Sequence, residues 1–166
     1  MDNSLINKEA KLSEHFNLGE LIKTSAKVDN TPSHGIVINL KNLCENWLED
    51  LRYSYNLLYC LKPGEDYEKS KNVEPIIINS GFRSEAVNKA VGGVAGSNHL
   101  YGYAVDIRCL GIEQAIRYAS ILLDIADGKK QEFDELLIER SPKGTYWIHF
   151  ASRPTNNRRK VKFIQT

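Results

Sequence analysis

Two short segments place histidine and aspartate side chains where they could bind a metal ion. Residues 97–106, SNHLYGYAVD, hold His99 and Asp106, and residues 146–150, YWIHF, hold His149. Imidazole nitrogen and carboxylate oxygen are both zinc ligands. Three protein ligands leave the fourth position of the ion open for water, as in catalytic rather than structural zinc sites. These residue types therefore predict a catalytic zinc site, in which bound water ionises near neutral pH.

Strand periodicity indicates that the site lies on one face of a sheet. Residues 103–108 alternate as a strand does, so Asp106 and Ala104 share a face while Val105 and Ile107 occupy the other. A carboxylate between apolar strand neighbours is unfavourable unless it is paired or bound to a metal. Gly102 permits a tight bend that can bring His99 back over Asp106.

The same alternation in the second segment places Trp147, His149 and Ala151 on the open side and Ile148 and Phe150 in the core. Spacing alone leaves another interpretation open. Strand-borne histidine is often a core or surface residue, and Asp106 could pair with Arg83 or Arg108 instead of a metal.

The remaining pattern predicts an α+β fold with a small antiparallel sheet and helices packed on one face. Apolar residues recur at helical spacing around residues 18–22, 39–60, 84–91 and 111–126. Strands are predicted at residues 75–79, 103–108, 133–139 and 145–151, with an edge strand at residues 158–165. The length of 166 residues predicts a single domain over residues 1–166.

Composition limits the partners. The chain is 42% hydrophobic and 26% charged with a formal net charge of +1, which favours neither a nucleic acid nor a membrane as partner. Residues 1–16 lack the apolar segment of a secretory signal. We therefore expect a monomer that is cytoplasmic until it is released, or that is associated with a phage. Three widely spaced cysteines predict free thiols rather than disulfides or a cysteine zinc site.

The pattern S-x-H-x-x-G-x-A-x-D at residues 97–106, followed by W-x-H at residues 147–149, resembles the zinc D-alanyl-D-alanine carboxypeptidases and the related phage-type endolysin peptidases. Residues 77–84, IINSGFRS, and residues 12–21, LSEHFNLGEL, are also similar to this family. The resemblance extends over about residues 12–151 and implies the hedgehog/DD-peptidase fold that the family shares.

The resemblance implies roles for individual residues. His99, Asp106 and His149 match the family's zinc ligands. Arg83 matches an arginine that holds a substrate carboxylate or carbonyl, for which a planar guanidinium is suited. Ser97 is expected to hydrogen-bond to substrate or to a ligand, or else to cap a turn. Trp147 is expected to form part of the substrate pocket.

One position departs from the family pattern. Many relatives carry an acidic general base three residues before the last histidine, where this chain has Tyr146, whose hydroxyl is a poor base at neutral pH. We predict that Glu139 takes this role, because it ends the strand expected to pair with residues 147–151. Asp134 and Glu135 are weaker candidates. In another interpretation, Tyr146 or Trp147 only forms the pocket wall and no strong base is present.

These observations predict a zinc metallopeptidase that hydrolyses the stem peptide of peptidoglycan, as a D-Ala-D-Ala carboxypeptidase or an endolysin-type endopeptidase. A cytoplasmic dipeptidase acting on D-Ala-D-Ala is a further possibility. Because of Tyr146, the alternative is a catalytically inactive, zinc-containing module that binds cell wall or serves in phage structure.

Overall fold

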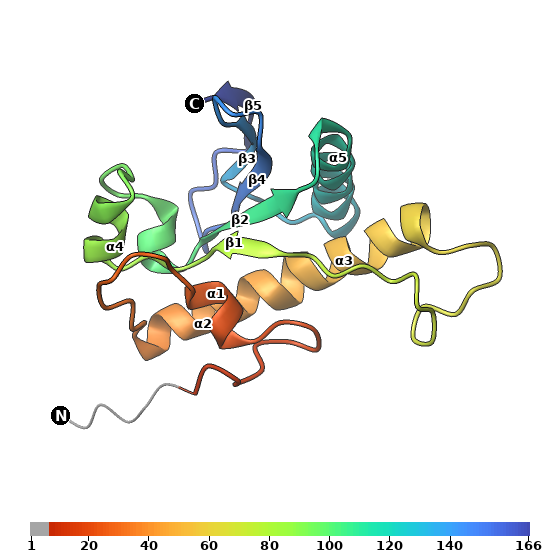
Figure 1. Ribbon diagram of the computed structural model, residues 1–166, viewed down its shortest axis with the longest axis horizontal. Helices are drawn as coiled ribbons and strands as arrows, with labels where there is room; N and C mark the ends of the chain where they lie inside the picture. The colour runs from red at the N-terminus through yellow and green to blue at the C-terminus, as the bar shows by residue number, and fades with distance from the viewer. Residues whose placement is uncertain (1–6) are drawn as a thin grey trace.

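A computed structural model describes residues 7–166 and shows an α+β fold built on one five-stranded sheet (Figure 1). The strand order is β1-β2-β4-β3-β5. The strands are β1 (Ile78–Ser80), β2 (Ala104–Cys109), β3 (Glu135–Arg140), β4 (Tyr146–Ala151) and β5 (Lys160–Gln165). Asp106 lies on β2 and His149 lies on β4, and these two strands are neighbours in the sheet.

The sheet is mixed, so the prediction of an antiparallel sheet was wrong at one edge. The pairs β1–β2, β2–β4 and β3–β4 are antiparallel, but β5 runs parallel to β3. The reason lies in the connection after β4. Residues 152–159 carry the chain back to the start of β3, where the Arg159 amide donates to the Phe133 carbonyl, so the last strand runs in the direction of β3.

One continuous helical run covers residues 34–60. It consists of α2 (His34–Leu43), a π-helical turn η1 (Cys44–Leu48), α3 (Glu49–Tyr55) and a second π-helical turn η2 (Asn56–Cys60). It begins five residues before the predicted start, because the Ser33 hydroxyl accepts a hydrogen bond from the Ile36 amide and caps the helix. The other helices are α1 (Leu18–Ile22), α4 (Glu85–Ala90), the 3-10 turn η3 (Asn98–Tyr101) and α5 (Ile112–Lys129).

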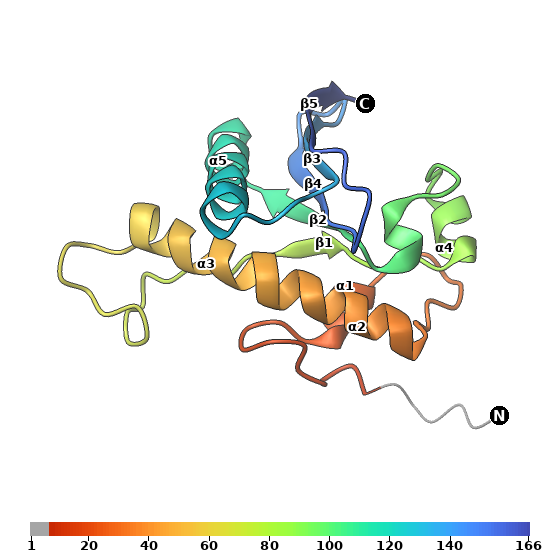
Figure 2. The ribbon, with the colours of Figure 1, turned by 180° about the vertical axis from the view of Figure 1, so that it is seen from behind.

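The hydrophobic core lies between this helical run, α1, α5 and one face of the sheet (Figures 1 and 2). Val105 and Ile107 of β2 and Ile148 and Phe150 of β4 are fully buried on that face. The predicted alternation of these strands is therefore confirmed. The opposite face of β2, β4 and β3 carries the polar side chains, and the segment with α4 and η3 borders it.

Within residues 7–166, no helix combines the length and apolar character needed to cross a bilayer. The three cysteines are unbonded thiols, as predicted.

Candidate active site

The pairing of β2 with β4 brings two of the predicted ligands together. Asp106 and His149 are directly opposite each other in the register, on the face turned away from the core. His99 reaches them from η3, which ends at Gly102 in the left-handed conformation with φ of 69°. A side chain at Gly102 would also approach Ile36 of α2 at 3.0 Å. Glycine at this position therefore permits the bend that returns the chain from His99 to β2.

Each histidine is held by a hydrogen-bond acceptor on the side away from the other candidate ligands. Nδ1 of His99 donates to the Gly81 carbonyl oxygen at 2.6 Å, and Nε2 of His149 donates to a Glu135 carboxylate oxygen at 3.2 Å. These contacts fix the protons on the outer nitrogens. The inner nitrogens, Nε2 of His99 and Nδ1 of His149, are left to present lone pairs to an ion.

The three inner donor atoms form a triangle that suits zinc. Nδ1 of His149 lies 3.0 Å from Oδ1 of Asp106, and Nε2 of His99 lies 3.3 Å from each of these two atoms. A tetrahedral zinc ion with bonds of about 2.0–2.1 Å separates its ligand atoms by roughly 3.3 Å. The donor types and their spacing therefore fit a zinc ion with three protein ligands.

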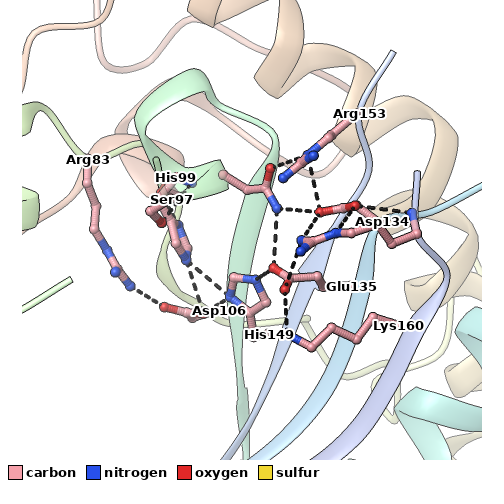
Figure 3. Close-up of polar contacts among 12 residues, drawn as sticks. Arg83, Ser97, His99, Asp106, Asp134, Glu135, His149, Arg153 and Lys160 are labelled. Carbon is pink, nitrogen blue, oxygen red and sulfur yellow. Dashed lines mark hydrogen bonds and ion pairs between the residues drawn. The ribbon is translucent and has the colours of Figure 1, made fainter. Parts of the chain in front are cut away.

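Arg83 binds the other oxygen of Asp106. Its Nη2 donates to Oδ2 of Asp106 (Figure 3). Its Nε donates to the Ser80 hydroxyl at 2.9 Å. Within residues 7–166 its Nη1 has no hydrogen-bond partner, and the side chain lines the cleft. Arg83 thus orients Asp106 and still offers one nitrogen toward the cleft.

Glu135 is the corresponding partner of His149, and two basic side chains hold it in place. Its Oε1 accepts from Nζ of Lys160 at 3.1 Å and lies 3.1 Å from Nη2 of Arg158 (Figure 3). A carboxylate behind a metal-binding histidine fixes the ring and increases its basicity. The sequence offers Glu135 only as a weaker candidate for the base, because no local pattern places this carboxylate beside Nε2 of His149.

When no metal is bound, the ionisable side chains of the cleft shift one another's pKa values. Burial alone would lower the pKa of His149, but hydrogen bonds with Asp106 and Glu135 outweigh it and raise the pKa to about 9. Burial alone would raise the pKa of Asp106, but His99 and His149 hold that pKa far below its usual range. The hydrogen bond from His149 likewise holds the pKa of Glu135 below its usual range.

Zinc binding should therefore be linked to pH. At pH 7 the metal-free chain carries a proton on His149 that zinc must displace, whereas Asp106 is already ionised. We expect release of about one proton per zinc, and an affinity that rises about tenfold per pH unit until it levels off near pH 9. Calorimetry in two buffers of different ionisation enthalpy measures the proton count. Equal heats in both buffers would contradict the coupling.

The sequence profile of the Peptidase M15 family matches residues 14–149. The chain belongs to the peptidase M15 family. A 34-residue segment is also 50% identical to the zinc D-Ala-D-Ala carboxypeptidase of Streptomyces albus G, and this match covers 20% of the chain and 13% of that enzyme's length. The predicted family relationship is confirmed, and it supports a zinc peptidase.

Glu139 lies in the same cleft, which has a volume of about 810 Å³. It is opposite Trp147 in the register, two residues from the pair of Leu137 with His149. Its carboxylate is half-buried, and it makes no hydrogen bond or ion pair with any residue in the described range 7–166. Burial, followed by the negative charge of Asp106, raises the pKa of Glu139. A half-buried, unpaired carboxylate of raised pKa has the properties of a general base.

Tyr146, which stands where the family pattern predicts an acidic base, faces away from the cleft. Tyr146 is three residues before His149, so strand alternation turns it to the opposite face, where it packs against the core. The interpretation in which Tyr146 forms a pocket wall was therefore wrong, whereas Trp147 does line the cleft.

Two further predicted residues have partners near the cleft. Asp134 is fully buried and accepts hydrogen bonds from Arg158 and Asn98, so its carboxylate is occupied. Ser97 lines the cleft, and its hydroxyl accepts a hydrogen bond from the His99 amide at 3.3 Å, which caps η3. Ser97 therefore contacts the backbone of a candidate metal ligand and caps a turn. The sequence alone left both alternatives open.

A conservative change tests the role of Glu135. We expect Glu135→Gln to lower zinc affinity by roughly 10–100-fold, because a neutral amide supports the imidazole of His149 less well. Competition with a chromogenic chelator measures the affinity. Glu132→Gln, an exposed glutamate three residues earlier, is the matched control and should bind zinc as the wild type does. Unchanged affinity in Glu135→Gln would show that this hydrogen bond does not support the metal site.

Proposed function

We propose that the chain is a zinc-dependent peptidase that hydrolyses the stem peptide of peptidoglycan, as a D-Ala-D-Ala carboxypeptidase or an endolysin-type endopeptidase. The observation that carries the proposal is the combination of a zinc-spaced donor triangle and an unpaired, half-buried Glu139 in one cleft. The similarity to a zinc D-Ala-D-Ala carboxypeptidase supports the substrate class. The proposal includes the hedgehog/DD-peptidase fold.

Each side chain has a role in this proposal. His99, Asp106 and His149 would hold zinc. When bound, zinc would polarise the scissile carbonyl and lower the pKa of water. Glu139 would take a proton from the attacking water on a carboxylate oxygen and return it to the leaving amine.

Substrate would be positioned by the remaining cleft residues. The outward nitrogen of Arg83 would bind a carboxylate or carbonyl oxygen of the peptide, at an angle fixed by its bonds to Asp106 and Ser80. Trp147 would pack against the peptide from its place beside His149. Ser97 would act mainly through His99, by keeping η3 in place.

Digestion of purified muropeptides tests the proposal. We expect one defined peptide bond to be cut, with loss of cleavage in a chelator and recovery when zinc is added back. A panel containing D-Ala-D-Ala, a free pentapeptide and cross-linked muropeptides would separate a dipeptidase, a carboxypeptidase and an endopeptidase by product mass.

The second candidate is a zinc-containing module without turnover, which binds cell wall or serves in phage structure. The position of Tyr146 favours it, because β4 supplies no base to the cleft. Stoichiometric zinc with no cleavage of any muropeptide, together with sedimentation on insoluble cell wall, would support this alternative and reject the peptidase.

A further inference from the structure

A second pocket lies between the long helical run and residues 152–157. It adjoins the cleft that holds the three candidate metal ligands, here called the metal cleft. Its volume of about 410 Å³ is within the roughly 300–1,000 Å³ typical of small-molecule sites. We name it the amide pocket and define it by six of its lining residues: Asn39, Asn42, Asn46, Trp47, Tyr103 and Arg153.

Three asparagines on one stripe of the long helical run provide its polar wall. Asn39 and Asn42 lie on α2, and Asn46 lies on the π-helical turn η1. Asparagine is among the weaker helix formers, so this stripe contributes little to helix stability. Within residues 7–166, the side-chain amides of Asn42 and Asn46 have no hydrogen-bond partner, and both residues are exposed. They can therefore donate to and accept from a ligand.

Two aromatic residues form part of the remaining pocket surface. Trp47 is buried at its base, and Tyr103 is half-buried at its side. The ring of Tyr103 stacks on that of Tyr101, with centroids 6.0 Å apart and planes 24° from parallel, which stiffens this side of the pocket. The helix is π-helical at Asn46 and Trp47, a local widening that is frequent at functional sites.

This combination suits a neutral sugar better than a charged ligand. Amides pair with hydroxyl and acetamido groups in both directions, and the half-buried ring of Tyr103 offers apolar surface to a pyranose ring. The charged residues that line the pocket are Glu132 and Arg153, and their charges balance.

Arg153 connects the amide pocket to the metal cleft. It lines both, and its Nε donates to Oδ1 of Asn98 at 2.7 Å and lies 3.1 Å from Oδ2 of Asp134 (Figure 3). Asn98 is the residue before His99. The Arg153 side chain therefore borders both the amide pocket and the metal cleft. A ligand long enough to pass Arg153 could occupy both at once.

We propose that the amide pocket is a saccharide-binding site that receives a sugar of the glycan strand to which the substrate peptide is attached. The assignment of the sugar to the glycan strand rests on the proposed function, in which the attached peptide lies in the metal cleft at the same time. The pocket would thus select glycan-linked stem peptide over free peptide.

The test uses the full chain with zinc and tri-N-acetylglucosamine as the probe, observed by saturation-transfer NMR. We expect binding to the wild type and a loss of affinity of roughly tenfold or more in the double variant Asn42→Ala/Asn46→Ala, because two neutral hydrogen bonds are removed. Gln165→Ala, an exposed amide on β5, is the matched control and should bind the probe normally. Equal zinc content in all three proteins checks that folding is intact.

A second readout compares kcat/KM for disaccharide-linked and free stem peptide. We expect the wild type to prefer the linked substrate and the double variant to lose that preference while it cleaves free peptide at the wild-type rate. No probe binding at millimolar concentration, or binding that the double variant retains, would overturn the saccharide site even if peptide is cleaved. Probe binding that depends on the two asparagines, without any cleavage, would uphold the pocket and reject the peptidase.

Discussion

Replacement of His149 by alanine is expected to reduce zinc in the purified protein from about one ion per chain to near zero, and to abolish peptide cleavage. Two protein ligands would remain, and a catalytic zinc site needs three. The loss of zinc affinity should be greater than the roughly 100-fold loss expected when a hydrogen-bond partner of a metal ligand is removed. Elemental analysis by mass spectrometry after dialysis without chelator gives the metal content, and muropeptide digestion gives the activity.

His34→Ala provides the control, since His34 is exposed at the start of α2 and far in sequence from the donor triangle. It should retain both zinc and activity. Zinc retained by His149→Ala at wild-type stoichiometry would contradict the assignment of this ligand. Absence of zinc from wild-type protein that never met a chelator would contradict the metal site altogether.

Glu139→Gln is expected to keep zinc but to lower kcat by about 100- to 10,000-fold, the range associated with a general acid–base group. Glutamine retains the size of the side chain and cannot accept the proton. The acid limb of kcat/KM should report the pKa of Glu139 in the zinc-loaded chain. Because the base must be ionised, activity should rise with pH through that pKa. The limb should disappear in the variant.

Glu135→Gln is the matched comparison for this experiment, because both glutamates lie on β3 and face the same cleft. It should lower zinc affinity, with kcat largely kept once zinc is saturating. The opposite pattern, in which Glu135→Gln loses kcat at saturating zinc and Glu139→Gln does not, would exchange the two roles. Full activity in Glu139→Gln would favour a mechanism without a strong carboxylate base.

Local chain geometry made several features predictable from the sequence. A strand has a period of two, so the alternation in residues 103–108 and 146–151 was enough to assign Asp106 and His149 to the open face and Val105 and Phe150 to the core. Gly102 identified the bend after His99, because only glycine adopts a left-handed conformation there at little cost. Helical spacing likewise located α4, whose start the Ser84 side chain caps.

Features that depend on contacts between distant segments could not be assigned from the sequence. Glu135 and Glu139 lie on the same face of β3, and residue type alone does not tell which of them contacts a histidine. The register places them on either side of the Leu137–His149 pair, and contacts with His149 and Lys160 distinguish Glu135 from the unpaired Glu139 within residues 7–166. The sequence offered both Arg83 and Arg108 as partners of Asp106, and the fold pairs Asp106 with Arg83.

The sequence by itself determined the family and the faces of β2 and β4, because these follow from residue chemistry and backbone period. Only the tertiary structure decided the direction of β5, the different contacts of Glu135 and Glu139, and the formation of the amide pocket beside Arg153. Each of these requires segments many residues apart to meet in one register. That register is set by packing of the whole core against the long helical run, which no local pattern contains.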